Sequence, residues 1–501
     1  MIELSAAEIA AVTQGQLSRT APAELLIDLA AIRTDSRECV PGSAYIAKPG
    51  EHSDGHSFIP TAIQAGAVLV LAEREILDPQ GEPYPAVIVP DAVLAMGQLA
   101  AEAVRRIRAA GDLTVIGITG SAGKTTTKDL LAGILQEAGP TVAPEGSYNG
   151  EIGVPLTVFR ADLNTRYLVV EMGATGIGHI NYLTSLVKPD IGVVLGVGSA
   201  HAGEFGGVEN IAVAKGEMVE ALSAQGTAVL NFNDGRVRAM AERGPAEVLW
   251  FAEGGSALPE GARAVVAWDV RSNAEAQPVF DLEFPASRGA KALRWPVRSG
   301  LIGLHHVPNL LAAAAAAWQA GVPEETIASA LDGQGPKSRW RMERTERADG
   351  VTVINDAYNA NPESMRAALR TLAELGHGVG ESRRTWAVLG PMLELGEESV
   401  LAHSALGQTV VRLNISRLIV VGTEARAMHI GAINEGSWGE ESRFVADVDE
   451  AYEILEKELS PGDLVLFKSS RDAGLRFLGD RIALAPIPGA DRNKQEGPSG
   501  R

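Results

Sequence analysis

The sequence has only one cysteine, Cys39, among its 501 residues. An intrachain disulfide and a metal site built from several thiolates are therefore both excluded. A chain so poor in cysteine suits a reducing compartment, although many proteins of oxidising compartments also lack cysteine.

Long hydrophobic runs are missing as well. The most apolar stretch, 310–318, is mostly alanine and far shorter than the ~20 residues that cross a bilayer as a helix. The first ten residues lack the basic region and the long apolar core of a signal peptide. We therefore expect a cytoplasmic protein without membrane insertion.

Positive charge is in short supply: 44 lysines and arginines face 63 acidic residues, which gives a formal net charge of −19. A surface this acidic repels phosphate backbones and anionic lipid headgroups, which argues against nucleic-acid and membrane-surface binding. An anionic substrate such as a nucleotide would have to be met by local positive groups.

Length and composition indicate a globular protein of about three domains. The hydrophobic fraction of 46% and the charged fraction of 21% are ordinary for such proteins. Changes of pattern along the chain place a small α/β domain at 1–110, a central domain with a mainly parallel sheet at 111–325 and a C-terminal α/β domain at 326–488. Residues 489–501 are polar without periodicity, so we expect a disordered tail.

Apolar runs and helical spacing predict the elements of each domain. Strand patterns that alternate with helix patterns are typical of a parallel sheet covered on both faces. From about 231 to 298 this alternation gives way to what we expect to be shorter, more polar strands. The expected strands are 44–47, 67–72, 86–89, 113–119, 167–171, 191–195, 264–270, 278–284, 351–355, 385–389, 418–421 and 463–467, and the expected helices are 92–110, 128–138, 310–321, 364–375 and 403–413.

A glycine-rich loop is the strongest chemical signal. The run from Gly117 to Thr127 follows a buried-strand pattern and precedes a helix pattern, as a phosphate-binding loop does. Its glycines let backbone N–H groups turn towards a phosphate, while Lys124 can reach the β- and γ-phosphates and the Thr125 hydroxyl can bind Mg²⁺. The general pattern has glycine where this chain has Ile118, so a chance turn that caps a helix is the alternative. The ATP-binding residues expected here are Thr119, Gly120, Ser121, Ala122, Gly123, Lys124, Thr125 and Thr126.

Two further polar side chains follow predicted strands of the central domain. Glu171 closes an apolar run, at the end of a strand where α/β sheets place their ligands. A carboxylate there could hold a metal for phosphoryl transfer, but acids at strand ends also cap helices. His201 follows the run 191–195. It lies at the same edge of the sheet as a candidate ligand, or it has only a structural role. Lys215, by itself, has the pattern of an ordinary exposed helix lysine.

Two polar segments follow strand patterns of the C-terminal domain. The segment 355–362 has five hydrogen-bonding side chains in eight positions, which indicates either a turn before a helix or a substrate-recognition segment. The segment 468–471 offers two cations and two hydroxyls. It could bind an anionic substrate, or form a solvated turn.

Together these segments resemble the Mur ligases of peptidoglycan synthesis, and above all the branch that adds a dipeptide. The resemblance runs through nearly the whole chain, and its order and spacing are specific although each piece alone is weak. The matching segments are Thr34-Asp-Ser-Arg37, Asp54-Gly-His56, Thr119 to Thr126, Asn149-Gly-Glu-Ile-Gly-Val-Pro155, Glu171-Met-Gly173, His201 with Glu204-Phe-Gly206, Ala214-Lys-Gly-Glu217, Gly303-Leu-His-His-Val-Pro-Asn309, Asp356 to Pro362, Met392-Leu-Glu-Leu-Gly396 and Lys468-Ser-Ser-Arg471.

The resemblance implies three domains: one for a UDP-sugar, a central P-loop-type ATPase domain and a Rossmann-like C-terminal domain for the incoming dipeptide. It also implies that ATP, with Mg²⁺, phosphorylates the terminal carboxylate of UDP-MurNAc-tripeptide. The amine of D-Ala-D-Ala then attacks the acyl phosphate, and a tetrahedral intermediate releases phosphate. Mg²⁺ and cations offset the charge that builds up during the transfer. A monomer is expected.

The resemblance also implies roles for single residues. Lys124, Glu171, His201 and Lys215 are the expected catalytic residues. Thr125 and Glu171 would hold a first Mg²⁺, His201 a second, and Lys215 would bind metal if it is carbamylated. The contacts expected for the other ligand groups are Asn309, Arg339 and Asp356 for ATP, Ser36 and Arg37 for the UDP-sugar, and Asn359 and Asn361 for the dipeptide.

Four positions depart from the usual family pattern. Gly196 and His306 stand where asparagine is common, Pro391 where aspartate is usual, and Ser469 where glycine is usual. They lie in or beside the expected cleft, so they bear on the exact contacts of ATP and dipeptide. They leave the expected catalytic residues untouched.

Three alternatives stay open at this point. A sister ligase that adds a single amino acid would share the central domain and differ in the C-terminal one. A folylpolyglutamate synthetase, a more distant relative, would ligate glutamate to a folate. From a different class, a nucleotide-binding regulatory module would bind ATP without catalysis. No sequence pattern identifies the third residue of the tripeptide or the oligomeric state.

Overall fold

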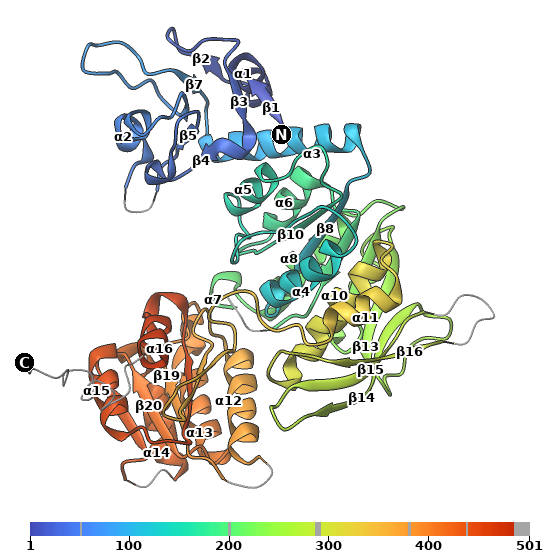
Figure 1. The fold of residues 1–501 in the computed structure, drawn as a ribbon, viewed down its shortest axis with the longest axis vertical. Coiled ribbons are helices and arrows are strands. Elements are labelled where there is room, and N and C mark those ends of the chain that lie inside the picture. The colour runs from blue at the N-terminus through green and yellow to red at the C-terminus, as the bar shows by residue number, and fades with distance from the viewer. Residues whose placement is uncertain (51–52, 199–201, 286–291, 379–381, 437–438, 485–501) are drawn as a thin grey trace, which may run out of the picture.

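The computed structural model describes residues 1–50, 53–198, 202–285, 292–378, 382–436 and 439–484, and it shows three α/β parts that follow one another along the chain (Figure 1). We name them the N-terminal, central and C-terminal parts. Each is built on its own sheet, and within the described ranges these sheets have five, nine and six strands. The predicted α/β fold is confirmed. His201 and the expected tail at 489–501 lie outside the described residues.

The N-terminal part has a small, mainly parallel sheet. Its strand β5 (Ala44–Ala47) is buried along its whole length, which explains its uninterrupted apolar sequence. Alternate side chains of β5 enter two cores: Ile46 joins the large core around α3, and Tyr45 joins a small core with Ile59 at the start of α2. The strand order is β2 (Gln16–Leu17), β7 (Ala86–Ile88), β6 (Leu69–Ala72), β5 and β4 (Ile32–Arg33); β1 (Glu3–Ser5) pairs with β3 (Leu26–Asp28), and the helices are α1 (Ala6–Thr13) and α2 (Ile59–Gln64).

Helix α3 (Ala92–Ala110) joins the N-terminal part to the central part (Figure 1). Asp91 starts the helix by accepting two hydrogen bonds, both of 2.8 Å, from backbone N–H groups of its first turn. The helix packs against α1 and also against α5 (Gly153–Phe159) and α6 (His179–Val187). Because α3 contributes to both parts, one hydrophobic core runs across them.

The central sheet is mainly parallel, and its arrangement marks one edge for ligand binding. Strand β8 (Thr114–Thr119) lies between β10 (Tyr167–Glu171) and β11 (Ile191–Val194), and it is parallel to both. After β8 the chain therefore adds strands first on one side of it, at β10, and then on the other side, at β11. Open α/β sheets bind ligands at the carboxyl ends of the strands where the chain changes side in this way. The other strands are β9 (Thr141–Val142) beside β10 and, beyond β11, β12 (Thr227–Asn231), β13 (Glu247–Glu253), β14 (Ala264–Ser272), β15 (Pro278–Glu283) and β16 (Arg294–Arg298).

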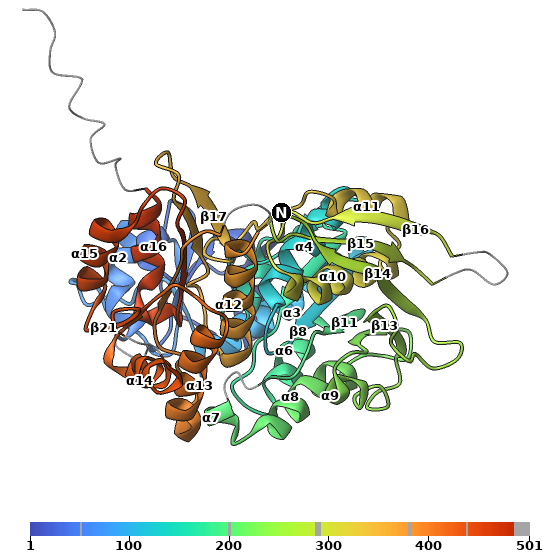
Figure 2. The ribbon, with the colours of Figure 1, turned by 90° about the horizontal axis from the view of Figure 1, so that it is seen from below.

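Helices cover both faces of the central sheet (Figure 2). Helices α6 and α8 (Val208–Glu220) contribute to the core on one face, and α4 (Lys124–Gln136), α10 (Val307–Gln319) and α11 (Glu324–Leu331) contribute to the core on the other. Helix α10 packs closely on α4 because its central residues are alanines, which are all fully buried.

The segment 231–298 differs from our prediction of shorter strands. Strands β12, β13 and β14 continue the parallel order, with the short helix α9 (Gly235–Arg238) between the first two. Strand β14 has nine residues and is the longest in the described part of the chain. Within this segment only β15 runs in the opposite direction, so that it is antiparallel to both β14 and β16. The polar character misled the prediction because these outer strands alternate buried and more exposed residues.

The C-terminal part has a second, mainly parallel sheet, into which the last strand is inserted between the second and the third. Helices α12, α13 and α14 form a core on one face, and α15 and α16 form a core on the other. The strand order is β17 (Glu343–Glu346), β18 (Thr352–Asn355), β22 (Leu464–Lys468), β19 (Thr385–Leu389), β20 (Arg417–Val421) and β21 (Ser442–Val445), and the helices are α12 (Pro362–Gly376), α13 (Ser399–Arg412), α14 (Arg426–Glu435), α15 (Val448–Glu458) and α16 (Leu475–Ala483).

Several helices begin earlier than predicted. Helix α4 begins at Lys124 instead of 128. The prediction missed its first turn because three threonines, which have low helix propensity, follow Lys124 there. Helix α10 begins at Val307 instead of 310, with a proline in its first turn, and α13 begins at Ser399 instead of 403. None of the helices in the described residues is long and apolar enough to cross a membrane.

Candidate active site at the edge of the central sheet

The glycine-rich loop lies at the carboxyl end of β8. Gly123 has a φ of +83° and directly precedes α4, and a Cβ there would lie 2.1 Å from Oδ1 of Asn309, so glycine is required. The backbone N–H groups of the first turn of α4 point towards the loop, as in phosphate-binding sites. Nζ of Lys124 donates to the carbonyl of Gly120 at 2.8 Å, so the lysine folds back over the loop.

The remaining loop residues connect neighbouring strands. Thr119 is fully buried, and its hydroxyl donates to the carbonyl of Met172 at 2.9 Å, which joins β8 to β10. The hydroxyl of Ser121 accepts a 2.9 Å hydrogen bond from the N–H of Gly198, beyond the end of β11. The loop therefore contacts both strands that flank β8. Gly120, Ala122 and Thr126 complete the loop and the first helical turn.

Glu171 ends β10 directly beside the loop and is 1% exposed. Its Oε2 accepts a 3.0 Å hydrogen bond from the hydroxyl of Thr125, and its Oε1 accepts a 2.8 Å bond from Nδ2 of Asn149. Glu171 thus contacts the loop threonine with one carboxylate oxygen. Asn149, which the sequence reasoning did not assign to the site, holds the other.

Lys215 lies on α8 and is only 4% exposed, so its interpretation as an exposed helix lysine is wrong. Its neighbour Ala214 is small and fully buried in the core that α8 shares with the sheet. Burial lowers the pKa of Lys215 to about 7, and repulsion from Lys124 adds to the effect. The two lysines therefore lie near each other although 91 positions separate them in the sequence.

Several basic side chains gather at this edge in the part of the chain that the structure describes. Burial lowers the pKa of Lys124, Glu171 opposes that effect, and the guanidinium of Arg341 adds to it. Lys124 therefore lies near two other basic side chains, Lys215 and Arg341, and near the carboxylate of Glu171. This is the local positive region that an anionic substrate requires in a protein whose net charge is −19.

Arg341 reaches this edge from the C-terminal part, and the sequence reasoning missed it. Its Nη2 donates to the hydroxyl of Thr125 at 3.2 Å, and its guanidinium lies 4.3 Å from the ring centroid of Tyr358. Arg339, the residue expected to contact ATP, instead pairs with Asp480 at 2.9 Å and with Glu343 at 3.3 Å. Two arginines lie two positions apart in this segment, and the sequence alone did not distinguish them.

Asn309 packs against the other side of the loop, as its position near Gly123 indicates. It is 8% exposed, its Oδ1 accepts a 3.4 Å bond from the hydroxyl of Thr127, and its Nδ2 lies 3.2 Å from Nδ1 of His306. Burial, with Lys468 and Arg341 nearby, keeps the pKa of His306 well below its usual range. This departure from the family pattern is therefore a neutral, buried imidazole in contact with Asn309.

Asp356 and Lys468 form a buried ion pair of 2.6 Å at the carboxyl edge of the C-terminal sheet. The other carboxylate oxygen of Asp356 accepts a 3.0 Å bond from the N–H of Met342, and Lys468 also donates to the carbonyl of Asn359 at 3.0 Å. Lys468, Ser469 and Ser470 are all buried, so the suggestion of a solvated turn is wrong for them. The charge of Lys468 is used within the protein and does not face an open surface.

The two asparagines expected at the dipeptide pocket differ in their surroundings. Asn361 is 7% exposed and caps α12, since its side chain accepts a 2.8 Å bond from the N–H of Ser364. Asn359 is exposed next to Tyr358. The segment is thus a helix-capping turn at Asn361, and it presents an accessible amide only at Asn359.

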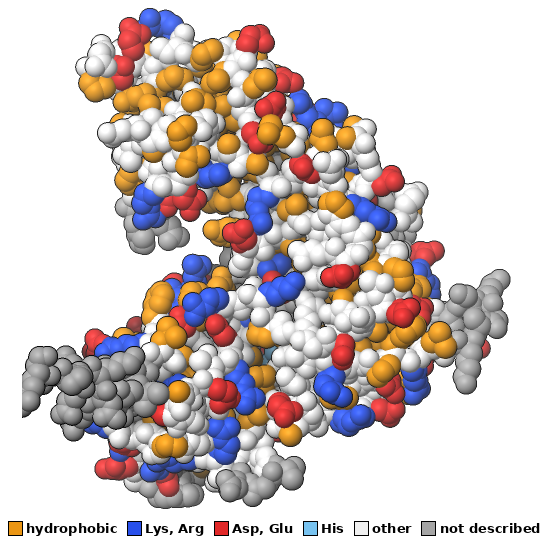
Figure 3. Space-filling view, viewed as in Figure 1, with side chains coloured by type: hydrophobic (Ala, Val, Ile, Leu, Met, Phe, Trp, Pro, Cys, Tyr) orange, Lys and Arg blue, Asp and Glu red, His pale blue; other side chains and the backbone are white. Residues whose placement is uncertain are grey.

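The two residues expected near the UDP-sugar lie in the N-terminal part between β4 and β5. Ser36 is 7% exposed, whereas the side chain of Arg37 is 85% exposed and pairs with Asp35 at 2.5 Å. A deep notch separates the N-terminal part from the C-terminal part on the face shown in Figure 3. The structure thus keeps Ser36 and Arg37 in a different part of the molecule from the phosphate loop.

The other departures from the family pattern lie at two sheet edges. The N–H of Ser470 donates to the carbonyl of Pro391 at 2.9 Å, and Ser469 is fully buried, so both positions support the edge of the C-terminal sheet. A Cβ at Gly196 would lie 3.3 Å from Oδ2 of Asp234, which leaves little room for a larger residue.

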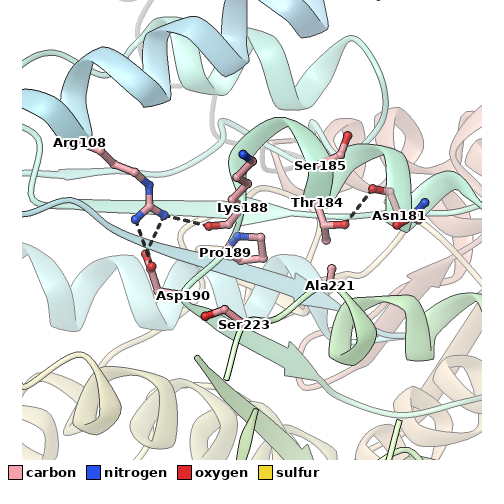
Figure 4. A pocket seen from close by; sticks show the side chains of 9 residues that line it. All are labelled: Arg108, Asn181, Thr184, Ser185, Lys188, Pro189, Asp190, Ala221 and Ser223. Carbon is pink, nitrogen blue, oxygen red and sulfur yellow. Dashed lines mark hydrogen bonds and ion pairs between the residues drawn. The ribbon is translucent and has the colours of Figure 1, made fainter. Parts of the chain in front are cut away.

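Two hollows lie near the central sheet. One, of about 430 Å³, opens beside the phosphate loop and is lined by Thr125, Arg341, Trp340 and Tyr358 among others. A second, of about 500 Å³, lies at the opposite end of the strands (Figure 4). There Arg108 pairs with Asp190 at 2.9 Å, and none of the predicted site residues lines it. The first hollow therefore belongs with the candidate site.

Oxygen atoms of the central edge suit a magnesium ion. The Thr125 hydroxyl and the Glu171 carboxylate lie 3.0 Å apart, and oxygen ligands of this kind are those that Mg²⁺ prefers. The described residues contain no group of three or more His, Cys, Asp or Glu side chains close enough to hold a metal by themselves. Phosphate oxygens and water would have to complete such a site.

Comparisons with known proteins agree along the whole chain. Residues 28–104, 118–317 and 340–471 match family models described as the Mur ligase family catalytic domain, the Mur ligase middle domain and the Mur ligase glutamate ligase domain. The chain is 43% identical to the UDP-N-acetylmuramoyl-tripeptide–D-alanyl-D-alanine ligase of Mycobacterium leprae over 515 aligned positions, which cover 96% of this chain and 98% of the relative. It is 31% identical to the protein of that name from Escherichia coli, over 85% of this chain and 88% of the relative.

Solved structures give the same result. A crystal structure of MurF from Acinetobacter baumannii superposes with a TM-score of 0.81 at 30% identity, and the match covers 96% of this chain and 99% of that one. The MurF ligase from Thermotoga maritima in complex with ADP gives a TM-score of 0.72 at 27% identity, over 91% and 98% of the two chains. The chain belongs to the Mur ligase family.

Proposed function

We infer that this enzyme uses ATP to join D-Ala-D-Ala to UDP-MurNAc-tripeptide in peptidoglycan synthesis. Its curated relatives carry the name of that ligase at 42–43% identity over nearly the full length. The observation that carries the chemistry is the convergence of Lys124, Thr125, Glu171 and Lys215 at one edge of the central sheet. That edge suits the activation of a carboxylate by ATP.

A carboxylate must be activated before an amine can attack it, because its negative charge makes it a poor electrophile. One carboxylate oxygen attacks the γ-phosphorus of ATP, and ADP leaves. The amine of the dipeptide then adds to the acyl phosphate, loses a proton, and expels phosphate as the amide forms. Negative charge builds up on the transferred phosphoryl group, and Lys124 and Arg341 are placed to offset it.

ATP and Mg²⁺ are the proposed cofactors. The ADP complex of the Thermotoga maritima relative supports nucleotide binding. A bound Mg²⁺ would neutralise phosphate charge, and Thr125 and Glu171 are the described residues whose oxygens would hold it. A second ion at His201 stays a prediction, since His201 lies outside the described residues.

Lys215 is proposed to act as a carbamate. A carbamate forms when a neutral amine attacks CO₂, and burial lowers the pKa of Lys215 to about 7, so much of it is neutral at neutral pH. The product is an oxygen-bearing anion that suits a metal ion better than an ammonium does. It would also reverse one positive charge beside Lys124.

The remaining ligand contacts are proposals of unequal support. For ATP, Asn309 is supported by its contact with the loop and Arg341 by its bond to Thr125, whereas Arg339 is engaged elsewhere. Asp356 is held by Lys468 and stays a proposed contact of the nucleotide. Ser36 and Arg37 are proposed for the UDP-sugar, and Asn359 with Asn361 for the dipeptide.

The domain roles and boundaries also remain proposals: 1–110 for the UDP-sugar, 111–325 for ATP and 326–488 for the dipeptide. The long core shared through α3 supports a firm connection between the first two. We further propose a monomer in the cytoplasm. Analytical ultracentrifugation with and without substrates tests the oligomeric state.

An assay with competing amines tests the proposed function. Purified enzyme receives UDP-MurNAc-tripeptide, ATP and Mg²⁺, and phosphate release is measured with D-Ala-D-Ala, diaminopimelate, lysine or glutamate. Release with the dipeptide alone supports the inference. Release with a single amino acid instead would indicate a sister ligase, glutamate transfer to a folate would indicate a folylpolyglutamate synthetase, and no turnover with any of them would leave a binding module.

A further inference from the structure

Helix α8, which carries Lys215, is covered on its outer side by Arg243. A Cβ added at Gly216 would lie 1.8 Å from Nη1 and 2.2 Å from Cζ of Arg243, so the guanidinium lies directly on the glycine backbone. Gly216 follows Lys215 in the sequence. The contact therefore depends on a missing side chain next to the proposed catalytic lysine.

Arg243 hydrogen-bonds to the same helical turn. Its Nη1 donates to the carbonyl of Ala212 at 3.1 Å and its Nη2 to the carbonyl of Val213 at 2.9 Å. Nε and Nη2 also donate to Oε1 of Glu220 at 2.9 and 2.7 Å, so all three guanidinium nitrogens are hydrogen-bonded to α8. In an α-helix the carbonyls of 212 and 213 accept from the N–H groups of 216 and 217, so the guanidinium binds the turn that contains Lys215.

The segment that carries Arg243 lies close to α8 for the same reason. It follows α9, which lies beside α8 (Figure 2). A Cβ at Gly244 would lie 2.3 Å from the carbonyl of Val219 on α8. Two glycines, one on each segment, therefore allow backbone and guanidinium to meet without intervening side chains.

The inner faces of α8 are held independently. Glu217 accepts hydrogen bonds of 2.6 and 2.9 Å from the N–H groups of Gly178 and Asn181 and so caps α6. Met218 lies against the sheet, where a Cβ at Gly117 or Gly192 would come within 3.0 or 2.9 Å of its side chain. Arg243 supplies the contact on the remaining side.

We propose that Arg243 is a positioning residue for the ligase reaction, which fixes Lys215 beside Lys124 by holding the turn of α8 through Gly216. The proposal rests on the proposed role of Lys215. Arg243 touches no expected substrate group, so it acts only through the helix backbone. A reacting group that is displaced by a fraction of an ångström loses much of its contribution to the rate.

Arg236 provides a matched control. Like Arg243, it follows β12 and pairs with a carboxylate of α8, since its Nη2 lies 2.7 Å from Oε1 of Glu209. Unlike Arg243, it bonds to Glu209 in the first turn of the helix and not to the turn at 212–216. Loss of Arg236 therefore removes an ion pair on α8 without releasing Lys215.

The test compares Arg243→Met, Arg243→Lys, Gly216→Ala and the control Arg236→Met. We expect Arg243→Met to lower kcat about tenfold, with the KM for ATP changed less than about twofold, and Arg243→Lys to recover part of the loss. Gly216→Ala should lower kcat in the same way, because the new methyl displaces the guanidinium. Its melting temperature should be unchanged or higher, since alanine favours a helix over glycine. Arg236→Met should match the wild type.

A double variant separates this proposal from the one on Lys215. In a Lys215→Ala background, Arg243→Met should not lower the residual kcat further, because the residue it positions is gone. An equal further loss there, or wild-type kcat in both Arg243→Met and Gly216→Ala, would overturn the positioning role. Full activity of Lys215→Ala alone would instead overturn the proposed role of Lys215, and the positioning role with it.

Discussion

The central and C-terminal sheets each bring a buried lysine to their carboxyl edge, and they use its charge differently. Lys468 is neutralised by Asp356 at 2.6 Å, and a backbone N–H holds the second oxygen of that carboxylate. Among the described residues, Lys124 has only a carbonyl as a hydrogen-bond acceptor, and the nearby Glu171 is occupied by Thr125 and Asn149. Lys468 thus has a carboxylate bound directly to it, whereas the described residues give Lys124 no such ion pair.

This difference in how the two lysines are paired indicates a structural role for Lys468 and a chemical role for Lys124. A buried ion pair whose oxygens and protons are satisfied contributes order at the edge of a sheet, and removing one partner leaves an uncompensated charge. A buried cation without a carboxylate of its own is costly unless a ligand completes it. The central edge is therefore the one that gains from an anionic substrate.

The largest effect is expected from Lys124→Ala. Loss of a cation that offsets charge on the transferred phosphoryl group should lower ATP-dependent phosphate release by about 10³-fold. The melting temperature should stay the same or rise, because a buried charge is removed. Phosphate release and thermal unfolding on the same preparation check both parts. ATP turnover equal to the wild type would reject the ligase assignment of this loop.

Lys215→Ala should come next, with a loss of roughly 10²-fold in kcat. If Lys215 acts as a carbamate, acetate or formate should restore part of the activity, because either anion can occupy the space of the carbamate. Rates are measured across a concentration series of each anion, with chloride at equal ionic strength as the control. No recovery would remove the support for a carbamate without excluding the ligase.

Lys468→Met sharpens the comparison from the other side. It leaves Asp356 buried without its partner, so the free energy of unfolding should fall by ~3–5 kcal/mol. Urea unfolding followed by tryptophan fluorescence gives this value, and Arg339→Met, which breaks a more exposed pair, serves as the control. A change below about 1 kcal/mol would mean that the C-terminal edge does not depend on this pair.

The smallest effect distinguishes two neighbouring arginines. Arg341→Met should raise the KM for ATP about tenfold, since it removes a charged donor beside Thr125. Arg339→Met should change it less than about twofold, because that side chain is half exposed and pairs with Asp480 and Glu343. The reverse order would restore Arg339 as the nucleotide contact.

The parts of the fold that follow from local pattern could be predicted. Buried strands such as 167–171 and 385–389 stand out as short apolar runs, and the structure gives them the same bounds. Helix beginnings were less visible, because the first turn of α4 consists of a lysine and threonines that serve the loop. The outer strands β14–β16 were underestimated because one of their faces is more exposed.

The candidate site was predictable only where a motif carries its own mechanism. The phosphate loop does so, and Glu171 follows from its place at a strand end. Lys215 does not, because its burial arises from the contact of α8 with the sheet and leaves no local trace. The pair of Asp356 and Lys468 is formed by residues 112 positions apart, and only the insertion of β22 beside β18 brings them together.

Transfer of an oxygen isotope from the tripeptide tests the central claim most directly. The enzyme receives UDP-MurNAc-tripeptide labelled with ¹⁸O in its terminal carboxylate, together with ATP and D-Ala-D-Ala, and the released phosphate is analysed by mass spectrometry. If the central edge activates the carboxylate as an acyl phosphate, one labelled oxygen must leave with each phosphate. Phosphate without label, alongside formation of the amide, would contradict this account.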